Sequence, residues 1–146
     1  MRAAVFVFVV FLVAGCQFGS DSGKAEFIRE ADAICATNER QIALIPQPQT
    51  YLRDFAVYMR RVVPIGRRQN RQLRALQAPE DVAADFSRMV TLLDEQLDMW
   101  AAASDDAYAG NDGQAQAQYE QSAGPGAEAQ RLAAEIGFFS CARPEG

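Results

Sequence analysis

The sequence predicts an all-α protein: an antiparallel four-helix bundle-like domain with one disulfide, preceded by a signal peptide that is cleaved off. Apolar residues recur at steps of three and four in four stretches, which is the period of an amphipathic helix. Breakers that contain proline or glycine separate these stretches. Two cysteines, Cys35 and Cys141, fall inside the helical region and are available to pair. At 146 residues the chain has room for one such domain.

The first fifteen residues are typical of a signal peptide. Arg2 supplies a positive charge, and residues 3–13 form an unbroken apolar run. As a helix, these eleven residues span about 16 Å, roughly half the hydrocarbon thickness of a bilayer, so they are too short to cross it. Small residues precede Cys16, and cleavage is therefore expected between Gly15 and Cys16.

The letters VAGC, which end at Cys16, resemble the lipobox of bacterial lipoproteins. In a lipobox the cysteine thiol receives a diacylglycerol, and two acyl chains on one residue suffice for stable anchoring. This interpretation predicts a domain anchored by lipid to the extracytoplasmic face of a bacterial cell membrane, either extracellular or periplasmic. An ordinary secretory peptide with an incidental cysteine is the alternative.

The chain divides into three parts on this basis. Residues 1–15 form the signal peptide, residues 16–23 the lipidated cysteine and its tether, and residues 24–146 the helical domain. The tether is expected to be flexible because it is polar and rich in glycine and serine.

Cys35 and Cys141 are expected to form a disulfide, because they are the even pair that remains outside the cytoplasm once Cys16 is acylated. The bond would close a loop of about 105 residues and stabilise the fold by roughly 4 to 5 kcal/mol in the chain-entropy treatment. A reactive or metal-binding thiol pair is the alternative. It lacks a Cys-x-x-Cys motif, and the chain contains no histidine.

The first two helices are predicted over residues 24–45 and after Thr50, which is a plausible N-cap. The motif PQPQ at 46–49 separates them, and Pro64 is expected to kink the second helix without ending it. The first buried face contains Phe27, Ala31, Ile34, Asn38, Ile42 and Ile45. The second contains Leu52, Phe55, Met59, Val62, Gly66, Gln69, Leu73 and Leu76.

The third helix is predicted to open with Pro79 at its first position and to stop at Gly110. Its buried face contains Val82, Phe86, Met89, Leu93, Leu97 and Trp100. The fourth helix is expected over 112–139, with Asn111 and Gln114 approximating a capping box. Its face is Ala115, Tyr119, Ala123, Ala129, Leu132 and Ile136, and GPG at 124–126 is expected to break or bend it. Bringing Cys141 to Cys35 then favours a short first helix and an interrupted fourth.

Three stretches, ADAICATNERQI, LRALQAPED and GFFSC, resemble a loose group of small helical bacterial lipoproteins known mainly from actinobacterial genomes and without an assigned function. The stretches cover both cysteines of the predicted disulfide and the turn between the second and third helices. The resemblance implies a disulfide-pinned helical domain on the cell surface. It carries no catalytic residues over to this chain.

Arginines of the second helix recur every seven residues beside its buried face, and pairing with acids on neighbouring helices is the favoured interpretation. An anion or lipid-headgroup site is the alternative, and its candidate contacts are Arg60, Arg67, Arg71 and Arg74. Nucleic acid is disfavoured as a partner because the net charge of the chain is −5.

Acids of the third helix, Asp94, Asp98 and Asp105, share a face and are expected to meet those arginines. They lack the alternating ligand pattern of a calcium loop, and without histidine the commonest general base is missing. We identify no cofactor or metal motif and expect no enzymatic activity.

A pocket between helices is the second functional candidate. Its residues would be Trp100 and Tyr119, which should lie level, with the amides Gln96 and Asn38 near the core. The favoured function is a lipid-anchored structural or protein-interaction module, with a small-molecule or lipid-binding carrier or sensor as the alternative.

Overall fold

The computed structural model describes residues 20–48 and 53–143. In these residues the chain forms four helices and no strand: α1 (Ser20–Ile42), α2 (Arg53–Arg74), α3 (Ala83–Ala109) and α4 (Asp112–Ile136). This part of the chain is therefore all-helical, as the sequence predicts. None of the described helices is long and apolar enough to cross a membrane.

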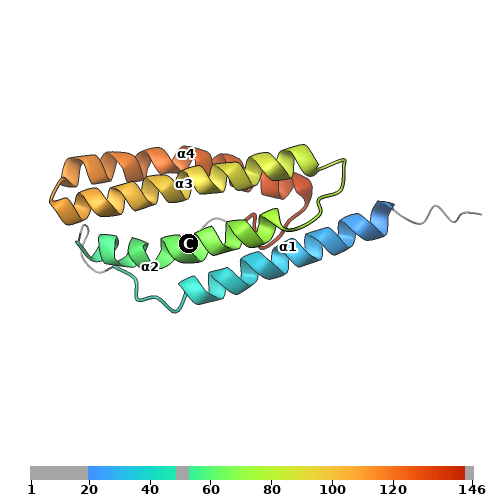
Figure 1. The fold of residues 1–146 in the computed structure, drawn as a ribbon, viewed down its shortest axis with the longest axis horizontal. Coiled ribbons are helices and arrows are strands. Elements are labelled where there is room, and N and C mark those ends of the chain that lie inside the picture. Colours follow the sequence, from blue (N-terminus) through green and yellow to red (C-terminus); the bar gives the residue numbers. More distant parts are fainter. Residues whose placement is uncertain (1–19, 49–52, 144–146) are drawn as a thin grey trace, which may run out of the picture.

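The helices run antiparallel in chain order (Figure 1). α2 lies between α1 and α3, and α3 and α4 make the most extensive contact. After α4 the chain turns back toward α1 (Figure 1). The α1–α2 connection and the α3–α4 turn lie at one end of the bundle, while α1 begins at the other end.

The larger hydrophobic cluster is built by all four helices. It includes Phe27, Ala31 and Cys35 of α1, Leu73 of α2, Phe86, Met89 and Val90 of α3, and Leu132 and Ile136 of α4. Phe138, just after α4, completes an aromatic group with Phe27 and Phe86, whose ring centroids lie 4.9 Å apart. A second cluster joins Met59, Val62 and Val63 of α2 to Leu97 and Trp100 of α3. These side chains largely confirm the predicted buried faces of the first three helices.

The α2–α3 connection differs from the prediction at Pro79. α3 begins at Ala83, because residues 79–82 form a separate turn in which the N–H of Val82 donates to the carbonyl of Pro79. Asp81 in this turn pairs with Lys24 of α1 at 2.7 Å. The hydrogen bond from Lys24 lowers the pKa of Asp81. The turn is thus tied to α1, and Pro79 is not the first residue of α3.

The α3–α4 turn confirms one predicted cap and contradicts the other. Gly110 ends α3 in the left-handed conformation, with φ of 81°. Asn111 Oδ1 accepts no capping bond, and the side chain instead donates through Nδ2 to Asp106 Oδ1 at 3.0 Å. The predicted capping box with Gln114 is therefore wrong.

The predicted interruption of α4 is also wrong. Residues 124–126 lie inside one helix, as Pro64 lies inside α2. A Cβ atom on Gly126 would overlap the side-chain amide of Gln96, so this glycine allows α3 and α4 to approach closely. The predicted inward positions Tyr119 and Ala123 are exposed, and Ser122 and Gly126 are buried instead.

α1 is not the short helix that the disulfide geometry favoured: it has 23 residues against 22 in α2. It begins at Ser20 and so includes residues 20–23, which were predicted to belong to the tether. Cys141 reaches α1 because Gly137, with φ of 103°, ends α4 and the chain folds back.

The predicted disulfide between Cys35 and Cys141 is present, with a Cα–Cα distance of 5.3 Å and a sequence separation of 106. Asp32, one turn before Cys35, holds the returning chain beside it. Its carboxylate accepts hydrogen bonds from the backbone N–H groups of Phe139 (3.0 Å), Ser140 (2.7 Å) and Cys141 (3.3 Å). Three donors on one carboxylate fix the backbone that carries Cys141.

Replacement of Gly66 tests the close contact between α2 and α3. In Gly66→Ala the new Cβ would lie 2.7 Å from a methyl carbon of the buried Leu97. Overpacking of this kind costs about 1 to 3 kcal/mol, which outweighs the gain in helix propensity of about 1 kcal/mol. We expect urea unfolding to show lower stability. Gly124→Ala is the matched control, because its Cβ meets nothing within 4 Å, and it should be neutral or stabilising.

Replacement of Asp32 tests its role beside the disulfide. Asp32→Asn keeps the shape of the side chain but removes the charge that strengthens three hydrogen bonds, so the free energy of unfolding should fall by about 1 to 3 kcal/mol. Glu30→Gln, at an exposed position of the same helix, is the control and should change stability by about 0.5 kcal/mol or less. Equal effects of the two variants in urea titrations would contradict this role.

Candidate functional site

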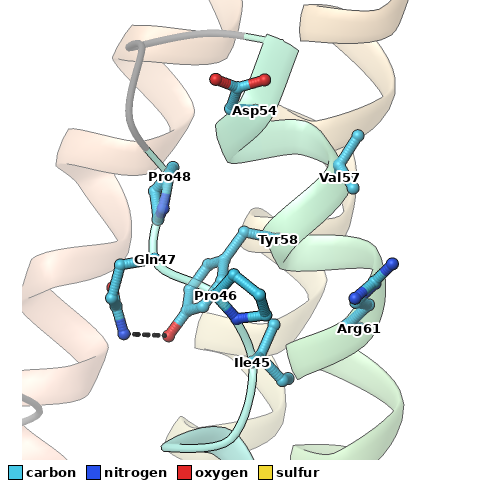
Figure 2. Close-up of a pocket in the computed structure, with 8 residues that line it drawn as sticks. All are labelled: Ile45, Pro46, Gln47, Pro48, Asp54, Val57, Tyr58 and Arg61. Atoms are coloured by element: carbon cyan, nitrogen blue, oxygen red, sulfur yellow. Dashed lines mark hydrogen bonds between the residues drawn. The ribbon is translucent and has the colours of Figure 1, made fainter.

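A pocket of about 240 Å³ lies between the α1–α2 connection and the first turns of α2 (Figure 2). It is lined by Ile45, Pro46, Gln47, Pro48, Asp54, Val57, Tyr58 and Arg61. Gln47 Nε2 donates to the hydroxyl of Tyr58 at 3.3 Å. Figure 2 shows Val57 and Arg61 on the side of α2 away from Gln47. The pocket is smaller than the 300 to 1,000 Å³ usual for drug-sized ligands and suits one small apolar group.

The connection has this shape because α1 cannot continue through Pro46 and Pro48. α1 ends at Ile42, and the N–H of Ile45 donates to its carbonyl at 2.9 Å to form a closing turn. The prediction that PQPQ separates the first two helices is confirmed, but α1 ends at Ile42, three residues before the predicted end at 45. Leu44 in this turn is 84% exposed, so an apolar side chain is exposed to solvent next to Ile45 of the pocket.

Three arginines of α2 form a ladder of ion pairs with α3. Arg60 pairs with Asp105 at 3.4 Å, Arg67 pairs with Asp98 at 2.8 Å, and Arg74 pairs with Asp94. The seven-residue spacing of the arginines matches antiparallel neighbours, and the predicted pairing of the two faces is confirmed. The first two pairs are largely solvent-exposed and therefore contribute about 1 kcal/mol or less each. Asp94 of the third pair is half-buried. Of the four arginines named as anion contacts, these three already face carboxylates.

Three further arginines of α2 form a different group. Arg68 donates to two neutral acceptors on α1, Asn38 Oδ1 at 3.2 Å and the side-chain oxygen of Gln41. Arg61 and Arg71 make no ion pair or hydrogen bond within the residues that the structure describes. We call Arg61, Arg68 and Arg71 the uncompensated arginines. Their charges are not neutralised by a described carboxylate partner.

Asn38 is a satisfied core amide. It is 1% exposed, and its Nδ2 donates to the carbonyl of Ile34 at 2.8 Å and to Gln72 Oε1 at 3.5 Å. Together with Arg68, these groups join α1 to α2 through polar contacts beside the core.

Trp100 is buried, and its indole N–H donates to the hydroxyl of Ser122 at 2.8 Å. Ser122 in turn donates to the carbonyl of Tyr119 at 2.6 Å. The ring of Tyr119 is 39% exposed and lies edge-on to Phe55, with centroids 4.9 Å apart. Gln96 packs against Gly126. Trp100 and Tyr119 are thus linked through Ser122, whereas Asn38 has separate neighbours on α1 and α2.

Sequence reasoning missed Ser122 and Asp32. Ser122 lies between positions that were predicted to be buried in the fourth helix. Asp32 lies on the first helix, away from its predicted buried face. Neither has a local motif that reveals its partner, because both bond to groups distant in the chain. No group of three or more cysteine, aspartate or glutamate residues suited to a metal ion occurs among the described side chains.

The predicted cleavage and lipidation residues, Gly15 and Cys16, lie outside the described residues, as does the predicted N-cap Thr50. Comparisons of the chain with protein-family models, with curated proteins and with solved structures found no match.

The Trp100 contact leads to a stability test. Ser122→Ala removes the acceptor of a buried indole N–H and leaves that donor unsatisfied, which costs about 1 to 3 kcal/mol. Ser87→Ala is the control, because Ser87 is exposed on α3. We expect thermal unfolding monitored by the single tryptophan to show a lower midpoint for Ser122→Ala alone. Matching midpoints would show that the hydrogen bond contributes nothing.

Proposed function

We propose that this protein is a lipid-anchored helical module with an interaction or structural role on the extracytoplasmic face of a bacterial membrane. The disulfide between Cys35 and Cys141 is the observation that carries the proposal, because such bonds persist mainly in oxidising compartments. The apolar run at 3–13 and the letters VAGC add an export signal and an acylation site to that argument.

The start of α1 supports a short link between anchor and domain. Ser20 follows Cys16 by four residues, and four residues reach at most about 14 Å. A domain on such a link stays beside the bilayer, so its surface meets the membrane and other envelope components at high effective concentration.

The interaction role rests on side chains at the surface. Leu44 is 84% exposed and Phe139 is 70% exposed, at the α1–α2 turn and in the segment after α4. Beside Leu44 lies the pocket with its apolar walls and Arg61 at its edge. Such groups favour contact with a partner surface over catalysis.

Substitution of Cys16 tests the anchor. The full chain produced in a bacterial host should fractionate with membranes, incorporate labelled fatty acid and begin at an acylated Cys16. Cys16→Ser removes the thiol that forms the thioether, so both the label and the membrane association should be lost.

Cys141→Ser is the matched control, since it also removes one thiol but should retain the fatty-acid label. Label that persists in Cys16→Ser would refute the lipoprotein assignment. Thiol alkylation without reductant should leave Cys35 and Cys141 unmodified in the unsubstituted chain.

A further inference from the structure

The positive charge of this protein is concentrated on one helix, α2. α2 carries seven arginines and one aspartate, a charge of +6, in a chain whose net charge is −5. The remaining residues therefore carry −11. A basic helix at the surface of an acidic chain attracts anionic partners, so a molecule that binds this helix must carry negative charge.

The positive charge that no described carboxylate neutralises lies on the uncompensated arginines. Arg61 and Arg71 are exposed, and no described carboxylate pairs with either. Ten residues separate them, which is about 15 Å along the helix. Arg68 lies between them and is held by neutral amides of α1, so its guanidinium is positioned without being neutralised.

Apolar side chains lie next to Arg61. Val57, one turn earlier on α2, is 39% exposed and lines the same pocket, together with Ile45 and Pro46. Asp54 also lines this pocket, and Glu39 on the last turns of α1 faces Arg143 at 3.5 Å. Exposed apolar groups beside arginines have the composition of a surface that adsorbs to an anionic bilayer.

We propose that the surface formed by Val57 and the uncompensated arginines lies on the anionic phospholipids of the membrane to which the chain is anchored. This inference rests on the proposed lipid anchor and adds an orientation to it. The bilayer is the occupant because the anchor already brings it within reach, whereas a soluble anion must bind from dilute solution.

The orientation follows from distance. Asn38, which contacts Arg68, lies eighteen residues after Ser20, or about 27 Å along α1. The Debye length at physiological salt is about 8 Å, so an upright α1 would hold Arg68 too far from the headgroups to interact. The arginines act on the bilayer only when α1 and α2 lie along it. The proposed contact therefore requires the domain to lie down with α1 and α2 against the bilayer.

Tryptophan quenching in vesicles tests this orientation. The lipidated full chain with Val57→Trp is reconstituted into vesicles of brominated phosphatidylcholine, alone or with about 30% phosphatidylglycerol. We expect the emission of the introduced indole to be quenched about twofold more in the anionic vesicles, and high salt to reverse the difference. Ala127→Trp, exposed on α4, is the matched probe and should show no such difference. The unsubstituted chain gives the contribution of the buried Trp100, which is subtracted from both.

A second quenching experiment removes the positive charge of the proposed surface. Arg61→Gln with Arg71→Gln removes no described ion pair or hydrogen bond, and it should abolish the anionic quenching because each arginine near a charged surface strengthens adsorption about fivefold. Arg88→Gln with Arg131→Gln removes the same charge from exposed positions of α3 and α4, away from α1 and α2, and should preserve the quenching. Equal quenching of the Val57→Trp and Ala127→Trp chains, or quenching that survives in Arg61→Gln with Arg71→Gln, would overturn the proposal.

Flotation separates this inference from the proposed function. A chain that floats with neutral vesicles but shows no anionic quenching is anchored and not oriented as proposed. A chain that fails to float with neutral vesicles lacks the anchor itself.

Discussion

The covalent link between Cys35 and Cys141 is the constraint on which the arrangement of this protein depends. α1 makes the least extensive helix contact in the bundle, and the described residues after α4, 137–143, form no helix. The disulfide and the carboxylate of Asp32 join these two elements over Phe27 and Phe138. With that junction closed, all four helices contribute to one hydrophobic cluster.

The helices and their buried faces were predictable because burial follows the helical period. Phe86, Met89, Leu97 and Trp100 are buried where that period places them. The ladder from α2 to α3 was predictable for a related reason: arginines seven residues apart stay on one side of a helix, and antiparallel neighbours place acids opposite them. Both patterns are local, and sequence alone contains them.

The features that sequence did not predict depend on contacts between distant segments. Pro79 is part of a turn in which Asp81 pairs with Lys24, 57 residues earlier. Gly124, Pro125 and Gly126 stay helical because α4 packs closely on α3, a tertiary effect that overrides the local tendency of proline and glycine to break helices. Whether an arginine of α2 is paired with a carboxylate also depends on its neighbours in space. Arg68 contacts amides of α1, whereas the adjacent Arg67 pairs with Asp98.

The position of the disulfide also decides how the domain carries mechanical load. Tension applied through the N-terminal end enters α1 at Ser20 and meets the sulfur bridge at Cys35. Tension that leaves through the residues after Cys141 crosses the bridge, so α2, α3 and α4 lie outside the loaded path. Among the described residues ahead of the bridge, the fifteen from 20 to 34 can be drawn out, to an extended length of about 50 Å. A chain pulled between these two ends would therefore lengthen by unfolding α1 up to Cys35, which removes Phe27 and Ala31 from the core, while α2, α3 and α4 bear no load.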